Sequence, residues 1–135
     1  MKKLFKKIII LKLKYLSKFV LWRYKPKIIA ITGSVGKTSA KDAIYAALKN
    51  SWHIRKNQKS FNSEIGVPLT ILGLENAWSN PWAWSLNLLK ALKVCVYEKE
   101  YPEWLVLEVG VDHPGDMKRT ASWLKPDVVV LTSFP

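Results

Sequence analysis

The chain has 135 residues, of which 49% are hydrophobic and 24% are charged, and its formal net charge is +12. This much apolar material can fill one modest core, so the composition excludes an intrinsically disordered chain. Cys95 is the only cysteine, which excludes an internal disulfide and a thiolate metal cluster; it is typical of a small hydrophobic residue in a reducing, cytoplasmic protein.

The first 27 residues carry nine lysines and Arg23 without one acidic residue, so most of the net charge lies there. We predict that residues 1–26 form a basic amphipathic helix, because apolar side chains recur at helical spacing. Lys12 and Lys14 interrupt the apolar run, which excludes a membrane span, and no small-residue cleavage site of a signal peptide follows. One face of the helix would carry Leu4, Phe5, Ile8, Leu11, Tyr15, Leu16, Phe19 and Trp22.

Two interpretations of this helix stay open. Residues 1–25 could lie on an anionic membrane surface, with the chain peripheral at its cytoplasmic side, or the helix could pack against the rest of the protein. Nucleic-acid binding is disfavoured, because such proteins usually spread their basic residues over the folded domain.

Residues 27–39 predict a strand, a glycine-containing turn and the start of a helix. Gly33 and Gly36 let the backbone approach an anion, while amides at a helix start attract one. The alternative is an ordinary strand-to-helix turn with a solvated lysine. Because strand, turn and helix stand in the order of a short phosphate loop, we predict ATP and Mg²⁺ as ligands. The predicted nucleotide-binding residues are Gly33, Ser34, Val35, Gly36, Lys37, Thr38 and Ser39.

The rest of the chain alternates between helical and strand patterns. Pro68 could open a short helix and Pro81 a longer one, in which a stripe of apolar side chains would pack in the core or, less plausibly, form an interfacial belt. The stripe contains Trp84, Leu88, Leu89, Leu92 and Val96. Helices are further predicted over 40–48 and 117–124, and strands over 52–55, 104–109 and 127–132. This order predicts an α/β fold, a P-loop-type parallel sheet with flanking helices spanning residues 27–135.

One carboxylate interrupts an otherwise apolar strand. Glu108 stands near the end of the strand predicted over 104–109, where a carboxylate is costly unless it is paired. Ligands of open α/β sheets gather at the carboxyl ends of the strands, so Glu108 is a candidate site residue.

Three blocks together resemble the Mur ligase family of ATP-dependent, amide-forming enzymes of peptidoglycan synthesis. They are residues 31–38, residues 61–70, and residues 107–110 with 113–116. The resemblance implies that ATP phosphorylates a substrate carboxylate and that an amine attacks the acyl phosphate. It also implies that Lys37 is catalytic, that Thr38 holds one Mg²⁺ and that Glu108 ligates a second Mg²⁺. By the same resemblance Asn62 and His113 lie beside the substrates, a peptidoglycan precursor and an amino acid or dipeptide.

The resemblance is incomplete. Ser63 and Ser133 stand where the family pattern usually has asparagine, and the resemblance covers about residues 26–135, roughly the first half of the family's central ATPase domain. We therefore expect a fragment of a longer reading frame or a truncated product that is not a competent ligase alone. The alternatives are a membrane-surface nucleotide-binding module without ligase activity and a ligase like the folylpolyglutamate synthases.

Overall fold

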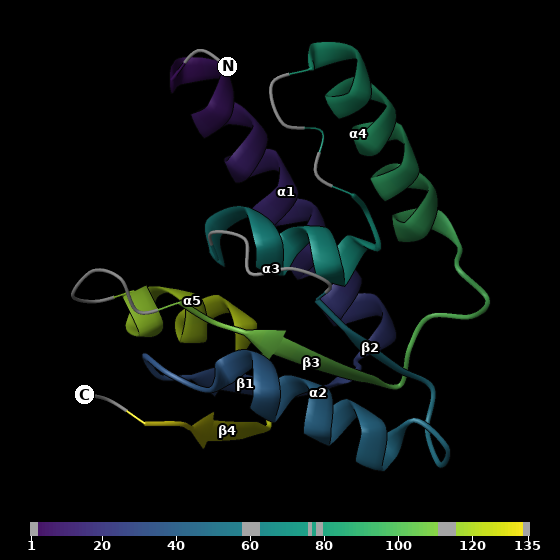
Figure 1. Cartoon of the computed structure of the whole chain (residues 1–135). Helices are drawn as coiled ribbons and strands as arrows, with labels where there is room; N and C mark the ends of the chain where they lie inside the picture. Colours follow the sequence, from purple (N-terminus) through teal and green to yellow (C-terminus); the bar gives the residue numbers. More distant parts are fainter. Residues whose placement is uncertain (1–2, 58–62, 76, 78–79, 111–115, 134–135) are drawn as a thin grey trace.

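The computed structural model describes residues 3–57, 63–75, 77, 80–110 and 116–133 (Figure 1). Its helices are α1 (Lys3–Tyr24), α2 (Lys37–Leu48), α3 (Ser63–Leu72), α4 (Pro81–Val96) and α5 (Asp116–Leu124). Its strands are β1 (Lys27–Thr32), β2 (Ile54–Lys56), β3 (Trp104–Glu108) and β4 (Val128–Leu131).

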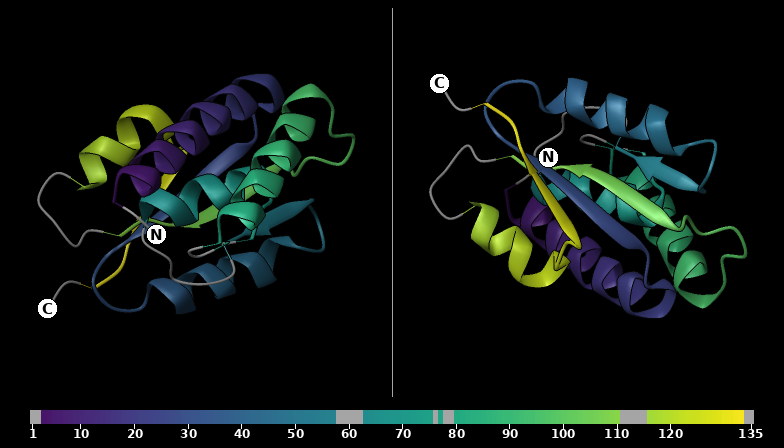
Figure 2. Two further views of the ribbon diagram at one scale, coloured as in Figure 1. Left: turned by 90° about the horizontal axis from the view of Figure 1, so that it is seen from above. Right: turned by 90° about the horizontal axis from the view of Figure 1, so that it is seen from below.

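The four strands form one parallel sheet in the order β2-β3-β1-β4, which confirms the predicted α/β fold. Ile29 pairs with Val106 on one side and Val128 on the other. Because all strands run the same way, the segments that follow β1, β3 and β4 meet at one edge of the sheet. Figure 2 shows α2 on one face of the sheet, and α1 and α5 on the other.

Strand alternation divides the core into two parts. Ile29 and Ile31 of β1 pack with Val106 of β3 against α2. Ile28 and Ala30 point to the opposite face and join a larger cluster that includes side chains of α1, α3 and α4. In β3, Glu108 is two residues from Val106, so both side chains lie on the face of the sheet that α2 covers.

Helix α1 packs on the rest of the protein through a row of side chains that neighbours the predicted apolar face. Its buried residues are Ile9, Leu13, Ser17 and Val20. The predicted apolar face is instead mostly exposed, although Phe5 and Leu16 are partly buried against the core. The helix is apolar over more than half of its circumference, so periodicity alone does not select the packing face. Within the described residues, no helix has both the length and the apolar composition needed to cross a membrane.

Two other helices differ in detail from the sequence prediction. Pro68 lies inside α3 rather than at its start. Helix α4 begins at Pro81 as predicted, because the Asn80 side chain accepts hydrogen bonds from the amides of Trp82 and Ala83. Its buried row is Trp84, Asn87 and Ala91, so the predicted core stripe is wrong for three residues that are exposed: Leu89, Leu92 and Val96.

Helices α1 and α5 end in the same way. Lys25 and Lys125 adopt left-handed conformations, with φ of 50° and 49°, and a proline follows each of them. Their amides donate to the carbonyls of Leu21 and Ala121 and so close the last helical turns. Glycine is the usual residue at such a position, because a side chain there costs roughly 1 kcal/mol.

The packing face of α1 can be tested with two leucines of one helix. Leu13 is 0% exposed and Leu11 is 52% exposed. We expect Leu13→Ala to lower the free energy of unfolding by about 2–5 kcal/mol, because it leaves a cavity. Leu11→Ala should change it by less than about 0.5 kcal/mol. Urea denaturation measures both values, and equal effects would contradict the observed orientation of α1.

Candidate functional site

The loop between β1 and α2 is shaped by two glycines with positive φ. Gly33 has φ of 141° and Gly36 has φ of 86°. A Cβ at Gly33 would stand 1.9 Å from Thr132 Oγ1, so only glycine fits where the loop passes the end of β4. A Cβ at Gly36 would have more room, because the nearest atom, the Cβ of Thr132, would be 4.0 Å away. Gly33 is therefore fixed by close packing and Gly36 by backbone conformation.

Two amides of this loop donate hydrogen bonds to the end of β4. The amides of Ser34 and Val35 donate to the carbonyl of Ser133, at 3.0 and 3.2 Å. This contact follows from strand pairing, because Thr132 N donates to Thr32 O at 2.8 Å and so places the carbonyl of Ser133 beside the loop. Ser133 was noted in the sequence only for its departure from the family pattern.

The start of α2 supplies the remaining main-chain donors. Gly36 is the N-cap residue and gives no side-chain hydrogen bond to the helix. The amides of the first turn, at Lys37, Thr38 and Ser39, have no acceptor within the helix by virtue of their position. The dipole of α2 adds partial positive charge at the same place, so this end of the helix can bind an anion.

Thr38 and Glu108, each predicted as a Mg²⁺ ligand, contact one another at the edge of the sheet. The Thr38 hydroxyl donates to Glu108 Oε1 at 2.6 Å, although the residues are 70 positions apart. Glu108 is buried, and Lys41 Nζ lies 3.7 Å from its other carboxylate oxygen. Thr38 and Lys41 share one face of α2 because they are three residues apart. The site therefore joins a hydroxyl, a carboxylate and a buried ammonium.

Lys41 and Asn57 belong to this site, and the sequence prediction missed both. Lys41 is 2% exposed. Its position on the apolar side of α2, close to Ala40 and Ile44, is the feature of the sequence that could have indicated its burial. Asn57 follows β2, and its Oδ1 accepts the amide hydrogen of Glu108 at 3.0 Å. That contact fixes the backbone at the end of β3, next to the carboxylate.

The other predicted site residues are partly outside the described chain. Asn62 and His113 both lie outside it. Lys37 is the first residue of α2 and is half-buried. Within the described residues, no group of three or more His, Cys, Asp and Glu side chains gathers as a metal cluster.

Comparisons with known proteins agree on one family. The family model "Mur ligase middle domain" matches residues 31–134. The UDP-N-acetylmuramoyl-tripeptide–D-alanyl-D-alanine ligase of Borreliella burgdorferi is 32% identical over 122 residues, which cover 90% of this chain and 21% of that protein. The Bacillus subtilis enzyme of the same name is 30% identical, with the same coverage. The chain thus spans about a fifth of the length of these relatives.

A solved structure shows the same arrangement. The MurF ligase from Thermotoga maritima, determined in complex with ADP, matches with a TM-score of 0.66 and 29% sequence identity. The match covers 92% of this chain and 23% of that one. A MurF structure from Acinetobacter baumannii, 24% identical with a TM-score of 0.61, shares the fold.

Gly33 can be tested against Gly36 as a matched control. Gly33→Ala should displace the end of β4 and break the bonds from Ser34 and Val35 to Ser133, because the new Cβ has no room. We expect hydrogen exchange of these two amides to accelerate by about tenfold or more. Gly36 also has a positive φ, but a Cβ there has room, so Gly36→Ala should leave hydrogen exchange of the Ser34 and Val35 amides nearly unchanged. Equal acceleration in both variants would contradict the packing role of Gly33.

The Lys41–Glu108 pair can be tested with a double-mutant cycle read by urea denaturation. Lys41→Met or Glu108→Gln alone should each lower the free energy of unfolding by about 3–5 kcal/mol, because each leaves a buried partner unpaired. The double variant should lose at least about 1 kcal/mol less free energy of unfolding than the sum of the two single losses.

The exposed pair of Lys56 and Asp42 is the control. Its atoms are only 2.8 Å apart, and the hydrogen bond from Lys56 lowers the pKa of Asp42. Solvent screening should nevertheless leave little coupling between them. A cycle in which the exposed pair coupled as strongly as Lys41 and Glu108 would contradict our description of the buried site.

Proposed function

The chain belongs to the Mur ligase family, and from this we propose that it is the ATP-binding part of an amide-forming ligase of peptidoglycan precursor synthesis in the cytoplasm. The observation that carries the proposal is the 2.6 Å contact between the Thr38 hydroxyl and the Glu108 carboxylate, at the start of α2. This contact supports the proposal because hydroxyl and carboxylate oxygens would suit Mg²⁺, and the main-chain amides at the start of α2 would attract phosphate.

Each residue of the site has a proposed role in binding ATP. The first-turn amides of Lys37, Thr38 and Ser39 would contact phosphate oxygens, and the Lys37 ammonium would balance their charge. The ADP bound to the Thermotoga relative supports a nucleotide at this site. Ser34 and Val35 would join as phosphate contacts when the carbonyl of Ser133 moves away from their amides.

Thr38 and Glu108 would hold Mg²⁺, because hydroxyl and carboxylate oxygens suit this cation. When bound, the ion supplies charge neutralisation for phosphoryl transfer. Lys41 Nζ, 3.7 Å from the buried Glu108 carboxylate, would give that carboxylate a charge partner. Asn57 holds the backbone of Glu108, so the carboxylate stays at the same place relative to α2.

The proposed reaction follows from the names of the relatives. ATP would phosphorylate the carboxylate of a UDP-muramoyl peptide, and the amine of a dipeptide such as D-alanyl-D-alanine would attack the acyl phosphate. ADP and inorganic phosphate would leave. Asn62 and His113 are proposed to lie on the substrate side of the site, by the same resemblance.

Calorimetric titration with ATP tests the binding proposal. We expect Lys37→Ala to weaken binding of ATP with Mg²⁺ by about 10- to 100-fold, because it removes a charge-assisted contact to phosphate. Thr38→Val should reduce the affinity in Mg²⁺ to the value measured without the ion. Lys49→Ala is the control, since Lys49 is an exposed lysine at the opposite end of α2. Equal affinities of the Lys37→Ala and Lys49→Ala variants would refute the phosphate-loop assignment.

A further inference from the structure

We propose that the outer face of α1 docks on an anionic phospholipid surface. This face is a row of large apolar side chains pointing away from the core, and it includes Leu4, Tyr15 and Trp22, which are 71%, 60% and 69% exposed. The row continues through Ile8, Leu11 and Phe19. From residue 4 to residue 22 it is about 27 Å long at 1.5 Å per residue.

The exposed row is not needed for packing, because a different row of α1 side chains packs against the core. Leu13 and Val20 are fully buried on the core side. At its C-terminal end, Arg23 Nη2 donates to Val96 O at 2.8 Å, and the Tyr24 hydroxyl donates to Val94 O. The helix is therefore held by α4 while its outer side chains stay in solvent. An apolar row of this length on a protein surface marks an interaction site.

Charge indicates which partner fits the row. At helical spacing Lys7, Lys14 and Lys18 border one side of it, and Lys12 and Arg23 border the other. Residues 1–27 contain no acidic side chain that could compensate them. An apolar strip with lysines on both sides matches a membrane interface, where apolar groups enter the acyl boundary and ammonium groups meet lipid phosphates.

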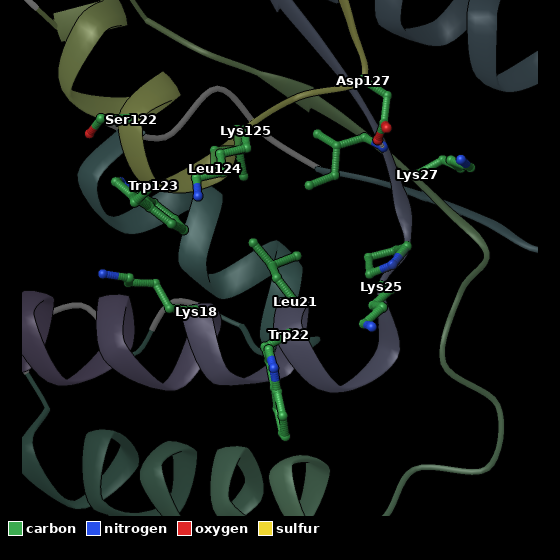
Figure 3. Close-up of a pocket in the computed structure, with 12 residues that line it drawn as sticks. Lys18, Leu21, Trp22, Lys25, Lys27, Ser122, Trp123, Leu124, Lys125 and Asp127 are labelled. Atoms are coloured by element: carbon green, nitrogen blue, oxygen red, sulfur yellow. Dashed lines mark hydrogen bonds between the residues drawn. The ribbon is translucent and has the colours of Figure 1, made fainter.

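A cavity beside the row extends this basic surface. About 550 Å³ in volume, it lies between the C-terminal ends of α1 and α5, and its lining includes Lys18, Lys25, Lys27 and Lys125. Figure 3 shows Leu21 and Trp123 pointing into the space between the two helices, while Trp22 points away from it.

The lining contains one carboxylate, Asp127, which accepts a hydrogen bond from the amide of Ile28 at 2.8 Å. The cavity is thus strongly basic and suits the phosphate of a lipid headgroup.

Exposed apolar residues on α4 offer a comparison within the same protein. Leu86 and Leu89 are 54% and 63% exposed, but this helix carries only Lys90 and Lys93 as charged residues. We therefore assign the membrane contact to α1 rather than to α4.

The apolar part of the proposal is tested by flotation of the full chain with vesicles of equal parts phosphatidylcholine and phosphatidylglycerol. Replacing Ile8 and Leu11 together by serine should weaken binding by about tenfold or more, because the replaced residues can no longer bury apolar surface. Leu86→Ser with Leu89→Ser has the same spacing and similar exposure and should bind like wild type. Failure of wild type to float, or a larger loss in the α4 variant, would overturn the assignment.

The charge part is tested by replacing Lys25 and Lys125 with glycine. Glycine relieves the left-handed backbone, so the unfolding midpoint should stay the same or rise. Affinity for the anionic vesicles should nevertheless fall by roughly 25-fold, at about fivefold per lysine. Unchanged affinity would refute a role for the cavity, and equal binding to pure phosphatidylcholine would refute electrostatic docking.

A second copy of the chain is the competing occupant of the row. Sedimentation equilibrium without lipid distinguishes it: the membrane proposal expects a monomer for wild type and for the α1 variant. A wild-type dimer that dissociates in the Ile8→Ser, Leu11→Ser variant, without flotation, would assign the row to self-association instead.

Discussion

A buried carboxylate constrains the edge of the sheet at which β1, β3 and β4 end. Glu108 ends an apolar strand, and an ionised carboxylate there is costly unless its oxygens find partners. Thr38 and Lys41 meet this need, and both stand on the first turns of α2. The end of β3 and the start of α2 are therefore held together, which fixes one end of the loop between β1 and α2. The rest of the loop is held at the end of β4, where Gly33 packs on Thr132 and the Ser34 and Val35 amides donate to Ser133.

Much of this arrangement could be predicted from the sequence, because it follows from strand direction. A glycine turn after one parallel strand and Glu108 at the end of another had to meet at the same edge of the sheet. The direct hydrogen bond between Thr38 and Glu108 was not predicted, because the family pattern assigns these residues to two different Mg²⁺ ions. Lys41 was not predicted either, since a lysine on a helix normally reaches solvent, and its burial is imposed by the carboxylate. The contact of Ser133 with the loop depends on how far β4 extends, which no local pattern specifies.

The sequence was least informative about which apolar face packs. Helical spacing in α1 and α4 correctly predicted helices, but each helix has apolar residues on both the inner and the outer side. The choice between Leu11 and Leu13 is made by the surface that α3 and α4 present, and those helices lie far along the chain. A local period contains no information about that surface.

The two proposed activities are compatible because the sheet separates them. Helix α1 and helix α2 lie on opposite faces (Figure 2), so a membrane under α1 leaves the loop and the start of α2 open to solvent. Substitutions at sites this distant usually act independently. Lipid binding would thus hold the protein at the membrane without altering its affinity for ATP, and a measurable coupling between the two ligands would require movement of the sheet itself.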